Sequence, residues 1–288
     1  MNISFKVRIL NFFRNIFRIK LIESFLISQT QNKLPYSLVC KLVPNPYQYA
    51  HGTFRTIHRN GLFIQVDISD YIGHYLYFGF LDSGIQNLFG LCQKNFNVID
   101  VGTNIGWVAL NFARLSESGR VIGFEPDPYN YSVCKSNSDR NALPNLTILP
   151  YALGETSSQV MMEVRTPDNR GGNRIAPKNG SGSVNVQIKR LDDIEEIASL
   201  SSINLVKLDV EGYELKVLRG AHATIQKHKP ILFIEVDDDN LLDQGDSAKG
   251  LVSFLEANGY ESIVHAETNE RITSSKNFSH CHFDIIAR

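Results

Sequence analysis

Acidic side chains able to act on a bound substrate follow two apolar runs in the second half of the chain. Asp209 lies at the end of the predicted strand 203–210, Glu211 follows it, and Glu235 ends the predicted strand 230–235. Because the carboxyl ends of parallel strands meet at one edge of a sheet, we expect the three carboxylates around one crevice. There they could accept the proton of an attacking hydroxyl, hold a divalent cation, or contact the positive end of a helix.

These three interpretations stay open from the sequence. We predict that Asp209, together with Glu211 and Glu235, forms the catalytic group that takes a proton, and we assign no metal ligand. In the helix-end interpretation, Glu211 and Glu214 only favour the N-terminus of the helix that they open. Lys207, which precedes them, is predicted to be a salt-bridge partner and not a nucleophile.

One histidine is a further candidate for the catalytic base. His74 lies in an aromatic segment, residues 71–80, upstream of the strand–helix alternation described below. Isolated histidines are more often structural than catalytic, but an imidazole is the side chain that titrates nearest neutral pH. No histidine in the chain has the H-E-x-x-H spacing of a metal site.

The segment DVGTNIG at residues 100–106 has the composition of a ligand-binding turn between a strand and a helix. Gly102 and Gly106 let the backbone approach a ligand. Their G-x-x-x-G spacing differs from the G-x-G-x-x-G of a dinucleotide pyrophosphate site, and the carboxylate of Asp100 would repel a pyrophosphate. It would instead attract the ammonium and sulfonium groups of S-adenosylmethionine. The turn therefore predicts a methyl donor in place of a nicotinamide cofactor.

A second acidic residue follows the next predicted strand, residues 120–124. In a doubly wound fold, an acid at the position of Glu125 accepts hydrogen bonds from ribose hydroxyls. Pro126 stiffens the loop that presents it. Ala152 comes shortly after a third predicted strand, residues 146–149, and we expect it near the adenine ring. Together the two turns predict a binding site for an adenosyl cofactor.

Strands and helices alternate from residue 97 onward, with helices predicted over residues 107–115 and 128–141. This alternation predicts an α/β, Rossmann-like fold with a mostly parallel sheet and helices on both faces. The last two predicted strands, residues 262–264 and 282–286, lack a helix between them, so we expect an antiparallel last strand. The catalytic domain is predicted to span residues 96–288.

Residues 1–95 are predicted to form an irregular N-terminal extension that caps the active site. Residues 8–18 have the pattern of an amphipathic helix, and its arginines would interrupt the core of a signal peptide. One side of this helix is apolar and carries Ile9, Phe12, Phe13, Ile16 and Phe17. We favour packing of the helix on the catalytic domain, while a peripheral membrane contact through residues 8–18 stays open.

The composition of the whole chain argues against several classes of protein. The 288 residues carry 29 basic and 30 acidic side chains, so the net charge is -1 and no nucleic-acid partner is expected. The four cysteines are scattered without a C-x-x-C pair, which favours a reducing compartment over a disulfide framework. We therefore expect a cytoplasmic protein, with a peripheral membrane location as the alternative.

Several ordered motifs resemble the FkbM family of methyltransferases, and the similarity runs over residues 95–265. The matching segments are DVGTNIGW at 100–107, GFEPDP at 123–128, RLDD at 190–193, KLDVEGYEL at 207–215, LRGA at 218–221 and PILFIEV at 230–236. The resemblance implies a class I methyltransferase fold, S-adenosylmethionine as methyl donor, and O-methylation of sugars, glycolipids or other natural products.

The resemblance also assigns roles to individual residues. Cofactor contacts fall on Asp100, Gly102, Asn104, Gly106 and Glu125. An active-site role falls on Asp209, with Glu211 and Glu235 beside it. Pro126, Ala152 and Asp209 complete the predicted cofactor set.

We therefore predict an S-adenosylmethionine-dependent methyltransferase that acts on a hydroxyl of a small molecule, glycan or lipid. Two alternatives are retained. One is a non-catalytic, methyltransferase-like scaffold associated with a membrane. The other is a nicotinamide-dependent oxidoreductase, which the glycine spacing at residues 100–106 disfavours.

Overall fold

The computed structural model describes residues 5–164, 166, 169–177, 180 and 182–288. The chain divides into two compact units. The first unit comprises residues 1–83 and 165–171, and the second comprises residues 84–164 and 172–288. The first unit thus takes in a short segment from the middle of the chain. A cap formed by residues 1–95 stays a prediction.

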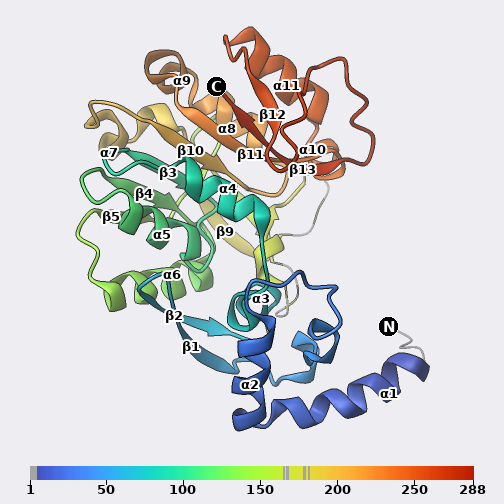
Figure 1. Ribbon diagram of the computed structural model, residues 1–288. Helices are drawn as coiled ribbons and strands as arrows, with labels where there is room; N and C mark the ends of the chain where they lie inside the picture. The colour runs from blue at the N-terminus through green and yellow to red at the C-terminus, as the bar shows by residue number, and fades with distance from the viewer. Residues whose placement is uncertain (1–4, 165, 167–168, 178–179, 181) are drawn as a thin grey trace. The chain divides into compact units, whose positions relative to one another are not determined.

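The second unit is built on a seven-stranded sheet with the order β12-β13-β11-β10-β3-β4-β5 (Figure 1). Its strands are β3 Val98–Val101, β4 Val121–Phe124, β5 Leu146–Leu149, β10 Leu205–Leu208, β11 Ile231–Asp237, β12 Ile263–His265 and β13 His282–Ala287. Neighbouring strands pair in parallel from β11 through β10, β3 and β4 to β5. Strand β13 runs antiparallel to both of its neighbours. The predicted mostly parallel sheet and antiparallel last strand are confirmed.

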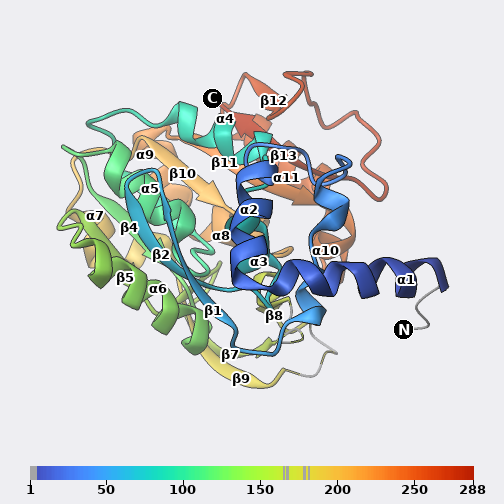
Figure 2. The same ribbon diagram turned by 60° about the horizontal axis from the view of Figure 1, so that its bottom comes forward.

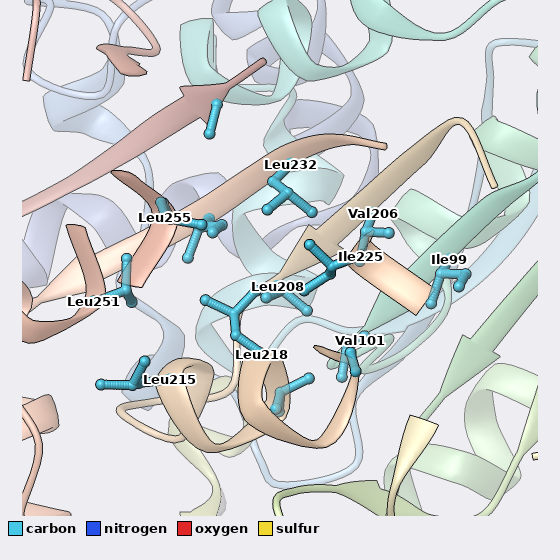
Figure 3. Packing of buried hydrophobic residues seen from close by; sticks show 14 of the residues in the cluster. Ile99, Val101, Val206, Leu208, Leu215, Leu218, Ile225, Leu232, Leu251 and Leu255 are labelled. Atoms are coloured by element: carbon cyan, nitrogen blue, oxygen red, sulfur yellow. The ribbon is translucent and has the colours of Figure 1, made fainter. Parts of the chain in front are cut away.

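Successive side chains of each central strand point to opposite faces of the sheet, and both faces carry apolar side chains. Helices therefore cover both faces. They are α4 Ser83–Leu91, α5 Trp107–Leu115, α6 Pro128–Asn141, α7 Glu195–Ala198, α8 Glu214–Gly220, α9 His222–His228, α10 Asp238–Asp243 and α11 Ala248–Ala257. On one face, Val206 and Leu208 of β10 pack with side chains from α8, α9 and α11 (Figure 3). On the other face, Leu205 packs with Leu88 of α4 and Phe112 of α5. Such double coverage leaves the ends of the strands as the accessible edges of the sheet.

A smaller sheet in the second unit has the order β6-β9-β7-β8. Its strands are β6 Ala152–Leu153, β7 Ser158–Glu163, β8 Arg174–Ile175 and β9 Val184–Lys189. Short 3-10 turns, η4 Arg170–Gly172 and η5 Leu191–Asp193, lie in the connections. This sheet has its own apolar cluster, which includes Met162, Val186 and Ile188.

The first unit combines short helices with a two-stranded antiparallel sheet. Its elements are α1 Phe5–Arg14, η1 Asn15–Arg18, α2 Lys20–Thr30, η2 Cys40–Leu42, η3 Pro46–Gln48, β1 Phe54–Arg59, β2 Leu62–Asp67 and α3 Tyr71–Phe78. The side chain of Asp70 caps α3 by accepting hydrogen bonds from the backbone N–H groups of Ile72 and Gly73. Within the described residues, no helix has the length and apolarity needed to cross a bilayer.

Candidate active site

The turn after β3 is packed directly against the end of β10. Gly102 has a φ of +82°, and a Cβ atom there would collide with the carbonyl oxygen of Asp209. Only glycine suits this position, because it has no Cβ atom and because other residues rarely adopt a positive φ. The predicted cofactor turn and the predicted catalytic acid are therefore neighbours at one edge of the sheet.

The turn after β3 is also joined to the end of β4. Glu125 accepts a hydrogen bond from the backbone N–H of Asn104 at 2.7 Å through Oε2, and one from the backbone N–H of Asp127 at 2.9 Å through Oε1. The side chain is almost completely buried, and burial raises the pKa of Glu125 to about 7. Each carboxylate oxygen still has a lone pair to offer to a ligand.

The buried side chain of Lys207 contacts both the turn after β3 and the end of β10. The Nζ atom of Lys207 donates to the carbonyl oxygen of Gly102 at 2.9 Å. It forms ion pairs with Asp100 Oδ1 at 3.4 Å and Asp209 Oδ2 at 3.2 Å. Burial alone would lower the pKa of Lys207, but the charges of Asp209 and Asp100 outweigh that effect and raise it. The predicted salt-bridge role of Lys207 is confirmed.

The predicted cofactor residue Asp100 lies beneath the turn. Its side chain is fully buried, and burial raises the pKa of Asp100 to about 6 against the opposing effect of Lys207. The Thr103 hydroxyl donates to the Asp100 carbonyl oxygen at 3.0 Å, which fixes the turn from within. Asp100 thus places a carboxylate beneath the turn, where it is paired with Lys207. Its contact with a cofactor stays a prediction.

The structure brings the three predicted catalytic carboxylates together. One oxygen from each of Asp209, Glu211 and Glu235 lies within 4.8 Å of the others. The Asp209 side chain is 46% exposed, whereas that of Glu235 is 17% exposed. Glu235 Oε2 is buried without a hydrogen-bond partner among the described residues. Burial, followed by the charges of Asp209 and Glu211, raises the pKa of Glu235 well above its usual range.

Glu214 is the first residue of α8, but the hydrogen bonds that its Oε1 accepts come from the turn before this helix, so the helix-end interpretation stays a prediction. Its Oε1 accepts hydrogen bonds from the backbone N–H groups of Val210 at 3.0 Å and Gly212 at 3.1 Å. Glu211 differs, because its Oε2 accepts a hydrogen bond from Asn240 Nδ2 at 2.8 Å. General-base catalysis and cation binding both stay predictions for the cluster of Asp209, Glu211 and Glu235.

His74 belongs to the first unit, while the carboxylates belong to the second. Its Nε2 lies 2.7 Å from the carbonyl oxygen of Pro44, an arrangement in which Nε2 carries the proton and donates it. The ring packs against Phe78, with 4.8 Å between ring centroids. Burial lowers the pKa of His74 to about 4, so the imidazole is neutral at pH 7. These contacts are those of a core histidine, and its catalytic role stays a prediction.

The remaining predicted cofactor residues lie at neighbouring strand ends. Gly106 has a φ of +94° and caps the N-terminus of α5. Pro126 is half-buried between Glu125 and the α6 cap residue, Asp127. Ala152 is buried at the start of β6, where it pairs with Ile188 of β9.

Two polar residues near this edge were missed by sequence reasoning. Asn240 of α10 binds Glu211, as described above, and the buried Arg174 of β8 donates to Asn240 Oδ1 at 3.3 Å. Arg174 also forms ion pairs with Glu163 at 3.0 Å and Asp243 at 2.9 Å. Neither residue belongs to a sequence motif. Their partners lie far away in the sequence, so no local pattern indicates these contacts.

Comparisons with known proteins identify related methyltransferases. Residues 100–262 match the family model described as the methyltransferase FkbM domain. The chain is 27% identical over 159 residues to 2-O-methyltransferase NoeI of Sinorhizobium fredii, a match that covers 50% of this chain and 64% of NoeI. It is 33% identical over 128 residues to the hexuronic acid methyltransferase AglP of Haloferax volcanii, covering 44% and 50%. The chain thus spans between half and two thirds of the length of these relatives.

Solved structures of methyltransferases were also found. The FkbM methyltransferase of Methylobacillus flagellatus aligns with a TM-score of 0.45 and 17% identity, covering 76% of this chain and 55% of that one. TYW2 of M. jannaschii, solved in complex with AdoMet, aligns with a TM-score of 0.46 and 13% identity, covering 83% and 86%. With the family match extending over more than half of its length, the chain belongs to the FkbM methyltransferase family.

Proposed function

We propose that the protein transfers a methyl group from S-adenosylmethionine to a hydroxyl of a sugar, glycolipid or related natural product. One observation carries the proposal: the Gly102 turn, Glu125, the carboxylates after β10 and Glu235 of β11 meet at one edge of the sheet. Family membership supports methyl transfer, and the names of NoeI and AglP support an oxygen acceptor on a sugar.

The residues at this edge fit the proposed donor. Both oxygens of Glu125 are held in place by backbone N–H groups and keep lone pairs for ribose hydroxyls. Glycine at 102 and 106 lets the turn pack closely on its surroundings, because an added Cβ would meet Asp209 at the first position and Leu110 at the second. The full proposed cofactor set is Asp100, Gly102, Asn104, Gly106, Glu125, Pro126, Ala152 and Asp209.

Catalysis in this proposal rests on positioning and on proton removal. When bound, S-adenosylmethionine supplies an electrophilic methyl group. Holding the acceptor hydroxyl at near-attack distance provides much of the rate enhancement. Asp209 accepts the hydroxyl proton, because its carboxylate is partly exposed and is oriented by Lys207. Burial, followed by the charges of Asp209 and Glu211, raises the pKa of Glu235, which favours its uncharged form beside Asp209.

Isothermal titration with S-adenosylhomocysteine tests the donor site. We expect wild-type protein to bind, and Glu125→Ala to weaken binding about 10-fold to 100-fold, the effect of losing hydrogen bonds to a charged acceptor. Glu117→Ala is the matched control, because Glu117 forms a surface ion pair with Lys94. An absence of binding in the wild type would favour the non-catalytic scaffold. Binding of NADH in its place would favour the oxidoreductase.

The acceptor side of the proposal includes a membrane contact. Ile9, Phe12, Phe13 and Ile16 of segment 8–18 are exposed, which supports a peripheral contact of that segment with a lipid surface. A glycan or lipid acceptor at a membrane would be consistent with such a contact.

A further inference from the structure

The N-terminal helix, by which we mean α1 with the η1 turn that continues it, is attached to the rest of the first unit through its polar side. Asn11 Nδ2 donates to the Tyr47 hydroxyl at 2.9 Å, and Arg14 Nε donates to the carbonyl oxygen of Lys41 at 2.9 Å. Gln48 Nε2 donates to Asn15 Oδ1 at 3.1 Å. A surface helix of a globular protein normally turns its apolar side inward and its polar side to solvent. Here the polar side makes the contacts.

The apolar side of the same helix is left uncovered. We call Ile9, Phe12, Phe13 and Ile16 the N-terminal apolar face. Phe12 is 71% exposed, and the other three are 46% to 53% exposed. Single exposed apolar residues are common, but a contiguous group of large ones marks an interaction site.

Further apolar side chains continue from this face. The chain bends at Ile19, where an extended residue separates η1 from α2 (Figure 2). Ile19 is 55% exposed, and on α2 Leu21 and Phe25 are 85% and 63% exposed. Among the described residues, eleven of the nineteen large apolar side chains that are strongly exposed lie between residues 9 and 42. The exposed apolar surface is therefore concentrated in one short part of the chain.

The charge of this region is as unevenly distributed as its apolar surface. Residues 1–66 contain nine lysine or arginine residues and one acidic residue, a formal charge of +8. The remaining 222 residues therefore carry -9. The single acidic residue, Glu23, is fully buried and paired with Arg55 at 3.3 Å. Arg8, Arg18 and Lys20, which flank or follow the N-terminal apolar face, are exposed.

These charges argue for one kind of partner. In a symmetric pair of copies, each N-terminal apolar face would meet its equivalent and place arginines opposite arginines. No exposed acidic side chain among the described residues of segment 5–66 could balance them. An anionic lipid surface offers both an apolar layer for phenylalanine and negative headgroups for arginine and lysine.

We propose that the N-terminal apolar face binds the surface of an anionic lipid bilayer, with the helix lying in the plane of the membrane. The four apolar side chains enter the boundary between headgroups and acyl chains, and Arg8, Arg18 and Lys20 contact headgroup phosphates. This deepens the proposed membrane contact by naming the lipid class and the face. It does not depend on methyl transfer, so vesicle binding and donor binding fail or succeed separately.

Cosedimentation of the full chain with vesicles tests the proposal. We expect binding to phosphatidylcholine vesicles that contain phosphatidylserine, weak binding to phosphatidylcholine alone, and loss of binding as salt is raised. Phe12→Ser should weaken binding about tenfold or more, because a phenylalanine leaves the apolar layer. Arg8→Glu should weaken it by about fivefold for each unit of charge changed.

Matched control variants distinguish a specific loss of vesicle binding from general effects of mutation. Phe63→Ser removes a 50% exposed phenylalanine of the same unit, which stacks on His58, and should leave vesicle binding unchanged. Lys249→Glu changes an exposed charge at the start of α11 and should do the same. Circular dichroism confirms that each variant is folded.

Three results would overturn the proposal. The first is an absence of wild-type binding to both vesicle types. The second is an equal loss of binding in Phe12→Ser and Phe63→Ser. The third is a wild-type dimer in light scattering that Phe12→Ser dissociates, which would make the face an interface between copies.

Discussion

The carboxylate of Glu125 and the backbone N–H of Asn104 are joined by a 2.7 Å hydrogen bond that ties the end of β4 to the turn after β3. The two motifs predicted to bind the cofactor therefore form one structure before any ligand arrives. Asn104 has a φ of +52°, an uncommon value for a residue other than glycine, and the bond to Glu125 helps to hold it there. A preorganised site of this kind loses little conformational entropy on binding.

The Gly102→Ala substitution should unfold or strongly destabilise the protein. The new Cβ would collide with the carbonyl oxygen of Asp209 and would require a positive φ for alanine. We expect a loss of at least about 2 kcal/mol in the free energy of unfolding. Gly90→Ala in α4 is the control, because nothing lies within 4 Å of its added Cβ. It should be neutral or stabilising by up to about 1 kcal/mol in urea unfolding. Equal effects of the two substitutions would contradict the packing of the turn.

The Lys207→Met substitution should be costly because it leaves the buried Asp100 carboxylate without its cation. Removing one partner of a buried ion pair typically costs about 3–5 kcal/mol. Urea denaturation at pH 7 measures this, with Lys249→Met as the exposed control, expected within about 0.5 kcal/mol of wild type. A stable Lys207→Met protein would show that Asp100 is neutral at that pH.

The Glu214→Gln substitution should change how stability depends on pH. Burial raises the pKa of Glu214 from 4.5 to about 7. Between pH 4.5 and about pH 7, the folded state therefore holds a proton on Glu214 that the unfolded state has released. Its contribution to stability is fully present below pH 4.5 and is lost as pH rises through 7.

Urea unfolding of wild type and Glu214→Gln, measured from pH 4.5 to pH 8, tests this. Glutamine keeps an oxygen to accept from the backbone N–H groups of Val210 and Gly212 and has no charge to desolvate. We expect the variant to gain stability relative to wild type as pH rises, by up to about 3 kcal/mol. A constant difference across the range would mean that Glu214 is ionised in the folded protein throughout.

The Asp209→Asn substitution should reduce methyl transfer far more than donor binding, because asparagine keeps an oxygen that can contact the donor but cannot take a proton from the acceptor. Loss of a general base typically lowers turnover about 10²-fold to 10⁴-fold. Turnover is followed with labelled S-adenosylmethionine and hydroxylated acceptors, and affinity with S-adenosylhomocysteine. Loss of both turnover and donor affinity, or of neither, would rule out this role for Asp209.

Chelation distinguishes the general base from a bound cation. If Asp209 works as a base without metal, treatment with EDTA should leave turnover unchanged. A loss of turnover that Mg²⁺ restores would instead assign the cluster of Asp209, Glu211 and Glu235 to a divalent ion.

The sequence by itself determined the mostly parallel α/β fold, and it predicted the edge of the sheet at which we propose the site. Short apolar runs ended by Asp100, Glu125 and Glu235 mark strands, and parallel strands bring their carboxyl ends to one edge. The antiparallel last strand followed from the missing helix between β12 and β13. These inferences succeed because they use local patterns and a topological rule, and neither requires knowledge of which distant side chains meet.

The tertiary structure decided the contacts made by those residues. Only the fold shows that Lys207 lies between Asp100 and Asp209, or that Asn240 binds Glu211. The N-terminal helix is amphipathic in the sequence, yet the pattern does not say which side faces the protein. That side is set by Lys41, Tyr47 and Gln48, which offer polar partners to the helix. Such pairings depend on the positions of distant segments in space, and a linear pattern carries no information about them.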